Sequence, residues 1–250
     1  MEIYLLLVGA GFLAGAMNAV AGGGSFITFP TLVLAGLPSV PANASSTVAL
    51  WPGAIAGVVA YRNDPQGFPE ISTRALLIIS VTGGLMGGLL LLATPSPTFD
   101  RIVPWLLLVS TVTFAFGQRM GVLLRRWVEI GPRALLVVQF ILCVYSGYFG
   151  GGVSIMMLAA WSLLLGGDIV RLNPTRILMV AASNSTAILA FIVAGQVWWP
   201  QTLAVLVGAV AGGYLGASIA RRTPPKTLRA AVITIATVMT AVFFYRAFQA

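Results

Sequence analysis

Apolar residues fill long stretches of this chain, and charged residues interrupt them only at intervals. No Asp, Glu, Lys or Arg lies between Glu2 and Arg62, or between Arg176 and Arg221. A helix needs about 20 apolar residues to cross the hydrocarbon core of a bilayer, so these stretches can hold several spans each. The ten apolar segments are residues 3–21, 25–37, 45–61, 75–93, 102–118, 134–149, 153–166, 177–194, 200–220 and 230–245. They predict an all-α polytopic membrane protein.

The two halves of the chain carry the same motifs in the same order. A polar linker at 119–133, which contains four arginines and Glu129, separates a first repeat at 1–118 from a second repeat at 134–250. The matching motifs are the glycine triplets at 22–24 and 150–152, the Ser-Thr pairs at 46–47 and 185–186, and the G-G-x-x-G motifs at 83–87 and 212–216. We interpret the chain as one integral membrane domain built from two repeats.

Each repeat is predicted to contain a glycine-broken helical hairpin followed by three transmembrane helices. Segments 25–37 and 153–166, which follow the triplets, are short for a membrane span at about 1.5 Å per residue. The pattern leaves open whether each hairpin re-enters on one side or makes two cramped spans. Either arrangement gives an even number of crossings, so the three later spans turn the second repeat upside down relative to the first, as an inverted repeat.

The basic residues predict the orientation in the membrane. The chain has 14 Lys and Arg residues against 6 Asp and Glu residues, for a net charge of +8. With linker 119–133 in the cytoplasm, only Arg101 and Arg246 fall on the outside, which agrees with the positive-inside rule. We therefore expect a multi-pass protein in the lipid bilayer of the cell inner membrane, with both termini extracytoplasmic and no nucleic-acid partner.

The composition narrows the chemistry available to such a protein. Hydrophobic residues make up 58% of the chain and charged residues 8%, histidine is absent, and Cys143, the one cysteine, is predicted to serve packing. The acidic residues are predicted to lie in loops or at the terminus: Glu2, Asp64, Glu70, Asp100, Glu129 and Asp168. Without histidine or an intramembrane carboxylate, a metal site, an intramembrane hydrolase and a cation transporter are disfavoured, and we expect no enzyme, metal or cofactor.

The glycine triplets are the strongest candidates for a binding site. A helix interrupted inside a membrane leaves backbone N–H and C=O groups unpaired unless protein or a polar cavity satisfies them, and paired breaks mark substrate sites in transporters. Free N–H groups at a helix N-terminus favour an anion. Clusters of Ser, Thr and Asn follow each triplet and add neutral donors. The candidate substrate-binding residues are Gly22, Gly23, Gly24, Ser25, Asn43, Ser46, Thr47, Gly150, Gly151, Gly152, Ser154, Asn184, Ser185 and Thr186.

Two pairs of side chains near the triplets receive separate predictions. Ser25 and Ser154 are predicted to cap the half-helices that follow the triplets. Arg171 and Arg176 are predicted to raise the anion concentration near a cytoplasmic mouth. A structural explanation stands beside binding, because Ser and Thr in membrane helices often bond to their own preceding turn and glycine breaks can serve packing.

Three stretches of the sequence resemble the TauE/SafE family of sulfite exporters, also called TSUP. They read A-G-G-G-S at 21–25, P-A-N-A-S-S-T at 41–47 and S-G-Y-F-G-G-G at 146–152, and the likeness in length and repeat covers essentially the whole chain. The resemblance implies a bacterial-type inner-membrane transporter for small sulfur-containing anions, such as sulfite, sulfonates including sulfoacetate, or related carboxylates. It also maps the family's glycine breaks and polar clusters onto the candidate residues named above.

Sequence and resemblance together predict a transporter that exports sulfite or an organosulfonate through a site between the two repeats near the membrane midplane. The alternatives are a passive anion channel and a carrier for another small organic anion. Because no intramembrane carboxylate is expected, transport is either passive, or moves a proton on the substrate, or is coupled in a way that the sequence does not reveal. Whether the protein forms a homodimer is also left open.

Overall fold

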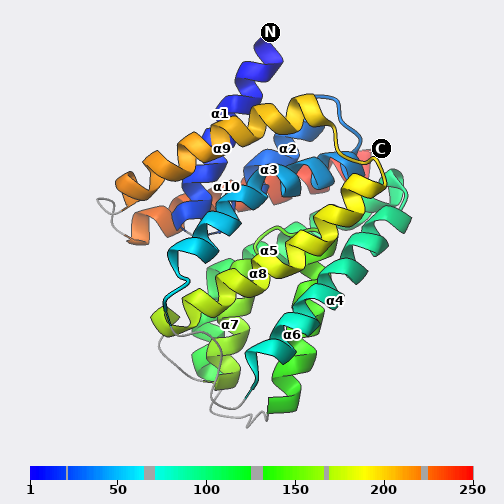
Figure 1. The fold of residues 1–250 in the computed structure, drawn as a ribbon. Helices are drawn as coiled ribbons and strands as arrows, with labels where there is room; N and C mark the ends of the chain where they lie inside the picture. The colour runs from blue at the N-terminus through cyan, green and yellow to red at the C-terminus, as the bar shows by residue number, and fades with distance from the viewer. Residues whose placement is uncertain (21, 65–70, 125–131, 166–168, 221–224, 250) are drawn as a thin grey trace.

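The computed structural model describes residues 1–20, 22–64, 71–124, 132–165, 169–220 and 225–249. Within these residues the chain forms ten α-helices and no β-strand, so the predicted all-α class is confirmed (Figure 1). The helices are α1 (Glu2–Val20), α2 (Ser25–Leu34), α3 (Ser39–Ala60), α4 (Thr73–Ala93), α5 (Ser96–Leu124), α6 (Pro132–Tyr148), α7 (Val153–Leu165), α8 (Ile169–Val193), α9 (Trp199–Ala220) and α10 (Pro225–Gln249).

Each predicted apolar segment contains one helix, but several helices begin earlier than hydropathy predicts. α3 begins at Ser39 rather than at residue 45, and α8 begins at Ile169 rather than at residue 177. Hydropathy measures how apolar the side chains are. A helix, in contrast, is held by backbone hydrogen bonds, which continue through turns with polar side chains. The prediction that Asp100 lies in a loop is wrong, because Asp100 belongs to the first turns of α5 and accepts a hydrogen bond from Ser39.

The predicted linker at 119–133 is partly helical. α5 continues to Leu124 and α6 begins at Pro132. Residues 125–131 lie outside the described part of the chain.

The helices that follow the glycine triplets are short. α2 has 10 residues and α7 has 13, which gives lengths of about 15–20 Å at 1.5 Å per residue, against a hydrocarbon core of about 30 Å. Among the described residues, Thr73–Ala93 in α4 and Leu172–Val193 in α8 are long and apolar enough to cross a membrane, by length and composition. Shorter apolar helices occur at Glu2–Asn18, Ser25–Leu34, Arg133–Tyr148 and Ile233–Phe248.

Large apolar side chains cover the outer faces of α4 and α9. Ile78 and Leu89 on α4, and Val207 and Tyr214 on α9, are each more than half exposed. In water, an apolar surface of this kind would mark an interaction or aggregation site. A bilayer accounts for it directly, because lipid chains solvate apolar side chains.

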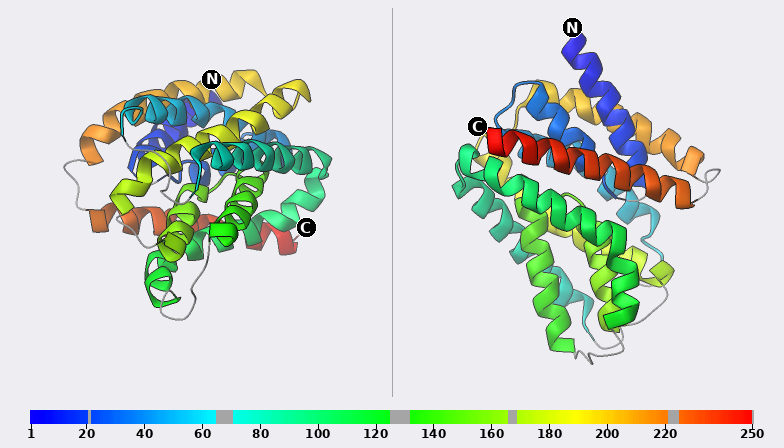
Figure 2. Two further views of the ribbon diagram at one scale, coloured as in Figure 1. Left: turned by 60° about the horizontal axis from the view of Figure 1, so that its bottom comes forward. Right: turned by 180° about the vertical axis from the view of Figure 1, so that it is seen from behind.

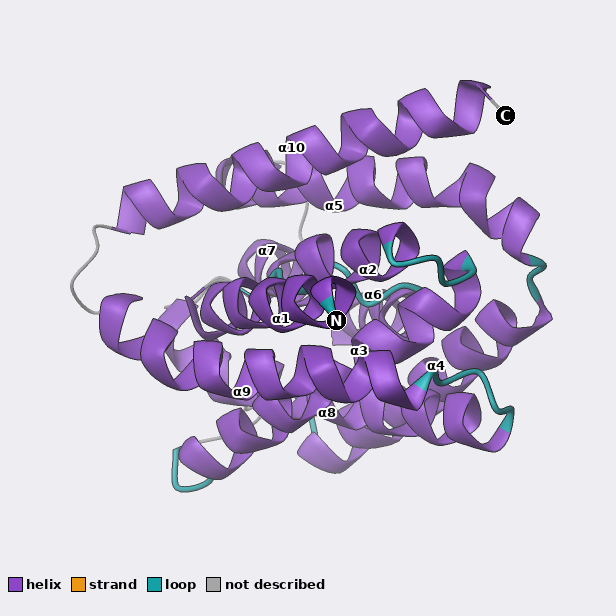
Figure 3. Ribbon diagram, turned by 90° about the horizontal axis from the view of Figure 1, so that it is seen from above, coloured by secondary structure: helices purple, strands orange, loops and turns teal. Residues whose placement is uncertain are grey.

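Helices of the two halves interleave instead of forming two separate bundles. α9 packs against α1 and α3, and α4 packs against α6 and α8. α2 contacts α10 as α7 contacts α5, and α3 meets α8. Seen from above, α5 and α10 lie side by side on one edge of the molecule, and α8 and α9 lie on the opposite edge (Figure 3). In Figure 3, α1, α2 and α7 lie between these two pairs. α5 and α10 are also adjacent in the view from behind (Figure 2). Each of these pairings is reproduced when corresponding helices of the two halves are exchanged.

Glycines allow the closest of these helix contacts. Gly212 of α9 lies against the backbone of Phe12 in α1, and Gly87 of α4 lies against the backbone of Val144 in α6. A side chain at either glycine would overlap the facing carbonyl oxygen. Small residues have this role in membrane helices, where close backbone approach supplies much of the packing energy.

A buried polar group links α4, α6 and α7 away from the glycine triplets. The Gln139 amide nitrogen lies 3.0 Å from the Ser80 hydroxyl and 3.2 Å from the Cys143 sulfur, and its oxygen accepts from the Trp161 indole at 3.1 Å. Cys143 is fully buried in the apolar core. These contacts agree with the expected packing role of the cysteine.

Candidate functional site

The first glycine break joins α1 to α2. Gly22 has φ +74°, and its N–H donates to the Met17 carbonyl at 3.3 Å, which closes the last turn of α1. Only glycine adopts this conformation without strain. The Gly24 N–H, at the start of α2, donates to the Asn18 side-chain oxygen at 2.9 Å. Asn18 was not among the predicted site residues. Its position, a polar residue about one turn before the triplet in an apolar segment, could have indicated a contact with the break.

The second break joins α6 to α7 in the same way. Gly150 has φ +74°, Gly152 has φ +75°, and the Gly150 N–H donates to the Tyr145 carbonyl at 3.2 Å. The Tyr145 hydroxyl lies 3.1 Å from the carbonyl of Gly151. A side chain of α6 therefore supports the break that follows it, as Asn18 of α1 supports the first break.

The two breaks lie against each other. A methyl group placed on Gly22 would lie 3.0 Å from Ser154 Cβ, in the first turn of α7. A methyl group placed on Gly152 would lie 3.4 Å from the Phe26 ring, in the first turn of α2. Each triplet thus contacts the half-helix that follows the other triplet, although the two lie more than a hundred residues apart in the sequence.

The first polar cluster faces the second break. Asn43, Ser46 and Thr47 of α3 are buried, and the Asn43 amide donates to the Tyr148 carbonyl at the end of α6, at 3.0 Å. Thr47 Oγ1 would lie 3.9 Å from a methyl group on Gly150. Ser46 Oγ lies 2.6 Å from the hydroxyl of Thr28 in α2. This cluster therefore joins the surroundings of both breaks.

The residues of the second polar cluster, Asn184, Ser185 and Thr186, contact different parts of the structure. Asn184 accepts a hydrogen bond from Ser146 of α6 at 2.9 Å, one turn before the second break. Ser185 accepts from the Trp51 indole at 2.9 Å, and Thr186 lies 3.0 Å from a backbone carbonyl of α4. Ser185 and Thr186 contact the neighbouring helices α3 and α4, whereas Asn184 points toward the break.

The two serines that follow the triplets differ from the predicted caps. Gly24 is the N-cap of α2 and Ser25 is the first residue inside the helix, so the expectation that Ser25 caps this helix is wrong. Asn18 of the preceding helix has taken that place, because its side-chain oxygen already accepts from the Gly24 N–H. Ser154 is the second residue of α7 and faces Gly22.

Arg176 lies close to the first glycine break. It belongs to α8, and its Nη1 would lie 4.0 Å from a methyl group on Gly22. Its Nη2 donates to the Asn173 side-chain oxygen at 2.5 Å. The side chain of Arg171, the other predicted arginine, lies outside the described part of the chain.

Aromatic rings close the space between the breaks. Phe26 packs against Gly23 and Gly152, and the Phe149 ring lies against Gly151. Both phenylalanines are fully buried, and Phe149 meets Phe29 edge to face with ring centroids 5.8 Å apart. A ligand that enters between the triplets would therefore have to displace these rings.

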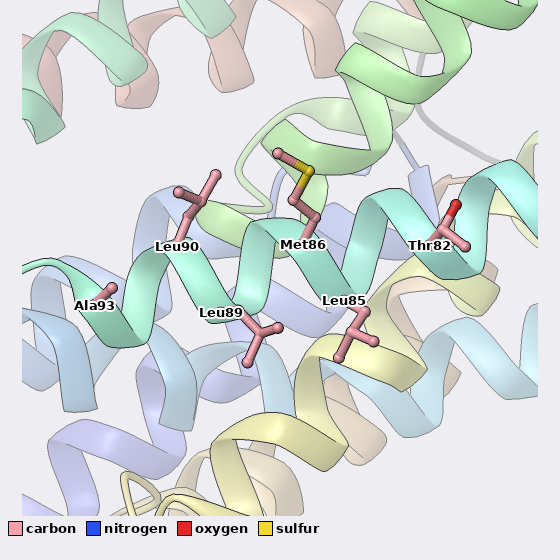
Figure 4. A pocket seen from close by; sticks show the side chains of 6 residues that line it. All are labelled: Thr82, Leu85, Met86, Leu89, Leu90 and Ala93. Atoms are coloured by element: carbon pink, nitrogen blue, oxygen red, sulfur yellow. The ribbon is translucent and has the colours of Figure 1, made fainter.

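Two surface grooves lie elsewhere and are apolar. One follows α4 and is lined by Thr82, Leu85, Met86, Leu89, Leu90 and Ala93 (Figure 4). The Thr82 hydroxyl bonds to its own helix at 2.8 Å, so this groove offers nothing to an anion. The second groove lies between α1 and α2. Both contain none of the predicted site residues and suit lipid chains.

In the described part of the chain, neutral donors and the guanidinium of Arg176 surround the breaks. Among the described residues, no group of three or more His, Cys, Asp or Glu side chains could hold a metal ion. Amides, hydroxyls and a guanidinium instead surround the triplets. Such a set suits an anion with oxygen atoms.

Replacing Asn43 by alanine is expected to destabilise the second break. Asn43 is 1% exposed, and its loss leaves the Tyr148 carbonyl without this donor. A buried group left unsatisfied costs about 1–3 kcal/mol, so the thermal unfolding midpoint in detergent should fall. The control is Thr82→Ala, since the exposed Thr82 hydroxyl bonds only within α4. Equal midpoints for the two variants would refute a bracing role for Asn43.

The comparisons with known proteins agree with one another. A family model described as "Sulfite exporter TauE/SafE" matches residues 7–243. A "Probable membrane transporter protein" of Haemophilus influenzae is 26% identical over 98% of this chain and 96% of its own length. Two further relatives, "Probable membrane transporter protein YfcA" of Escherichia coli K12 and "Probable membrane transporter protein ORF9" of a Sinorhizobium species, are 26% and 23% identical, over 93% and 90% of this chain and 86% of each relative. No solved structure matches the chain.

Proposed function

Because this chain belongs to the TauE/SafE family of membrane transporters, we propose that it exports a small sulfur-containing anion, sulfite or an organosulfonate, through a site where its two glycine breaks meet. The observation that carries this proposal is the contact of Gly22 with Ser154 and of Gly152 with Phe26. The family and its relatives consist of transporters, which agrees with the expectation that the chain is not an enzyme.

An inverted repeat is part of the proposal. The exchange of equivalent helix pairings between the halves supports it. So does the pair Thr111 and Thr240, whose hydroxyl oxygens lie 3.2 Å apart between α5 and α10. These threonines occupy matching positions when the G-G-x-x-G motifs at 83–87 and 212–216 are aligned. Matching residues of two related units meet where their symmetry axis passes, so we place the axis of the proposed repeat at this contact.

The proposed substrate follows from the donors at the breaks. Sulfite and sulfonates present oxygen atoms that share negative charge, and they accept hydrogen bonds from N–H and O–H groups. Glycine leaves room for an anion close to the backbone. The positive-inside pattern supports an orientation with both termini extracytoplasmic in the inner membrane, so that cytoplasmic sulfite would enter from the side of the basic loops.

Purified protein in liposomes is expected to move sulfite with saturable kinetics. External sulfite should also accelerate the exit of labelled internal sulfite, since a carrier exchanges substrate faster than it returns empty. A panel of sulfite, sulfoacetate and acetate tests the substrate class, with protein-free liposomes as the control. Flux that never saturates and shows no counterflow would favour the passive channel. A lack of flux for every sulfur anion in the panel would end the substrate proposal.

A further inference from the structure

Arg176 is placed where an anion in the proposed site would need a positive charge. It belongs to α8, within the stretch Leu172–Val193 that is apolar enough to span a membrane. An ionisable side chain in such a segment is rare and usually has a functional role. Its Nη1 and the Ser154 hydroxyl approach the same face of Gly22, since a methyl group there would lie 4.0 Å and 3.3 Å from them.

The guanidinium of Arg176 is only partly used by the protein. Nη2 donates to Asn173, whereas Nε is shielded from solvent and has no hydrogen-bond partner in the described part of the chain. No carboxylate among the described residues is paired with it. A charge held away from bulk water without a counter-ion is unfavourable, and the guanidinium N–H groups that do not bond to Asn173 can donate to the oxygen atoms of an anion.

The two repeats differ in sequence at the positions of Arg176 and Ser154, so this pair of polar side chains is found in the second repeat and not in the first. The alignment that matches Ser46 with Ser185 places Leu37 at the position of Arg176, and the alignment of the glycine triplets places Phe26 at the position of Ser154. Leu37 and Phe26 are both buried and apolar. The positions that match Arg176 and Ser154 in the first repeat therefore carry apolar side chains, so this pairing of a charge with a hydroxyl beside Gly22 is not repeated at those positions.

We propose that Arg176 binds the transported anion directly, through Nη1, at the junction formed by Gly22 and Ser154. This inference rests on the proposed function, because it names the group that holds the anion in that site. It assigns a single binding position on one side of the repeat axis, not two equivalent ones. The ligand class is an oxyanion with at least two oxygen atoms on one centre, such as sulfite or a sulfonate.

The experiment compares sulfite transport by Arg176→Gln, Arg176→Lys and wild-type protein in liposomes. Arg176→Gln is expected to raise the KM for sulfite about 10- to 100-fold, because a hydrogen bond to a charged group is lost, with a smaller change in kcat. Arg176→Lys keeps the charge but lacks the guanidinium, so its KM should lie between those of the other two. The control is Arg62→Gln, which removes an exposed arginine that follows α3 and donates to the Val59 carbonyl near the end of α3 at 3.2 Å.

The outcomes separate this inference from the proposed function. If wild-type protein carries no sulfur anion, the proposed function fails first. If wild-type protein transports sulfite and Arg176→Gln keeps the same KM, the assignment of Arg176 is overturned. Should Arg176→Gln fail to fold, as judged by size-exclusion profile, Arg176→Lys decides: an increased KM supports direct binding, and an unchanged KM refutes it.

Discussion

Gly22→Ala is expected to reduce sulfite transport at least tenfold, whereas Gly36→Ala should leave most of it intact. Both glycines have positive φ, at +74° and +91°, so both substitutions impose similar backbone strain, of about 1–2 kcal/mol. Only at Gly22 does the new methyl group meet other groups, namely Ser154 and Arg176, while at Gly36 nothing lies within 4 Å. The comparison therefore separates loss of the junction from loss of a left-handed turn.

Initial uptake rates in liposomes, normalised to reconstituted protein, measure this difference. Thermal midpoints of both variants in detergent give the control for folding. Similar midpoints with transport lost only in Gly22→Ala would agree with a site at this junction. Equal transport by the two variants would mean that the contact between the breaks does not matter for transport.

Gly212→Ala is expected to destabilise the protein by about 1–3 kcal/mol through overpacking. The new methyl group would overlap the carbonyl of Phe12, which fixes the contact between α9 and α1. The neighbouring Gly213→Ala supplies a matched control, because its methyl group would meet only the Gly15 carbonyl at an ordinary 3.8 Å. Alanine favours a helix over glycine by up to about 1 kcal/mol, so the control should be neutral or slightly stabilising.

Thermal unfolding followed by loss of the monodisperse elution peak measures the effect. A clearly lower midpoint for Gly212→Ala than for Gly213→Ala is the expected result. If both variants unfold at the wild-type temperature, the close approach of α1 and α9 does not contribute to stability as described.

The sequence predicts the helices well because their cause is local. A run of apolar residues without charge has few alternatives in a bilayer, so ten segments correspond to ten helices in the described residues. The helix ends were less predictable. Ser39 and Ile169 extend α3 and α8 beyond their apolar runs, since helix formation depends on backbone hydrogen bonds and continues outside the hydrocarbon.

Side-chain direction within the candidate site could not be predicted from order along the chain. Ser185 and Thr186 contact α3 and α4, while Asn184 beside them reaches toward the second break. Adjacent residues on a helix point about 100° apart, and the rotation of α8 is set by its neighbours. The position of Arg176 beside Gly22 likewise depends on how α8 packs, and its place before an apolar segment did not predict it.

The most direct test is to locate a bound substrate analogue. Selenite resembles sulfite in shape and charge, and its selenium atom can be found by anomalous scattering in crystals of the wild-type protein. The account predicts one selenium peak between the glycine breaks, beside Gly22, Ser154 and the guanidinium of Arg176. Selenium bound only at the outer surface, in protein that transports sulfite, would contradict it.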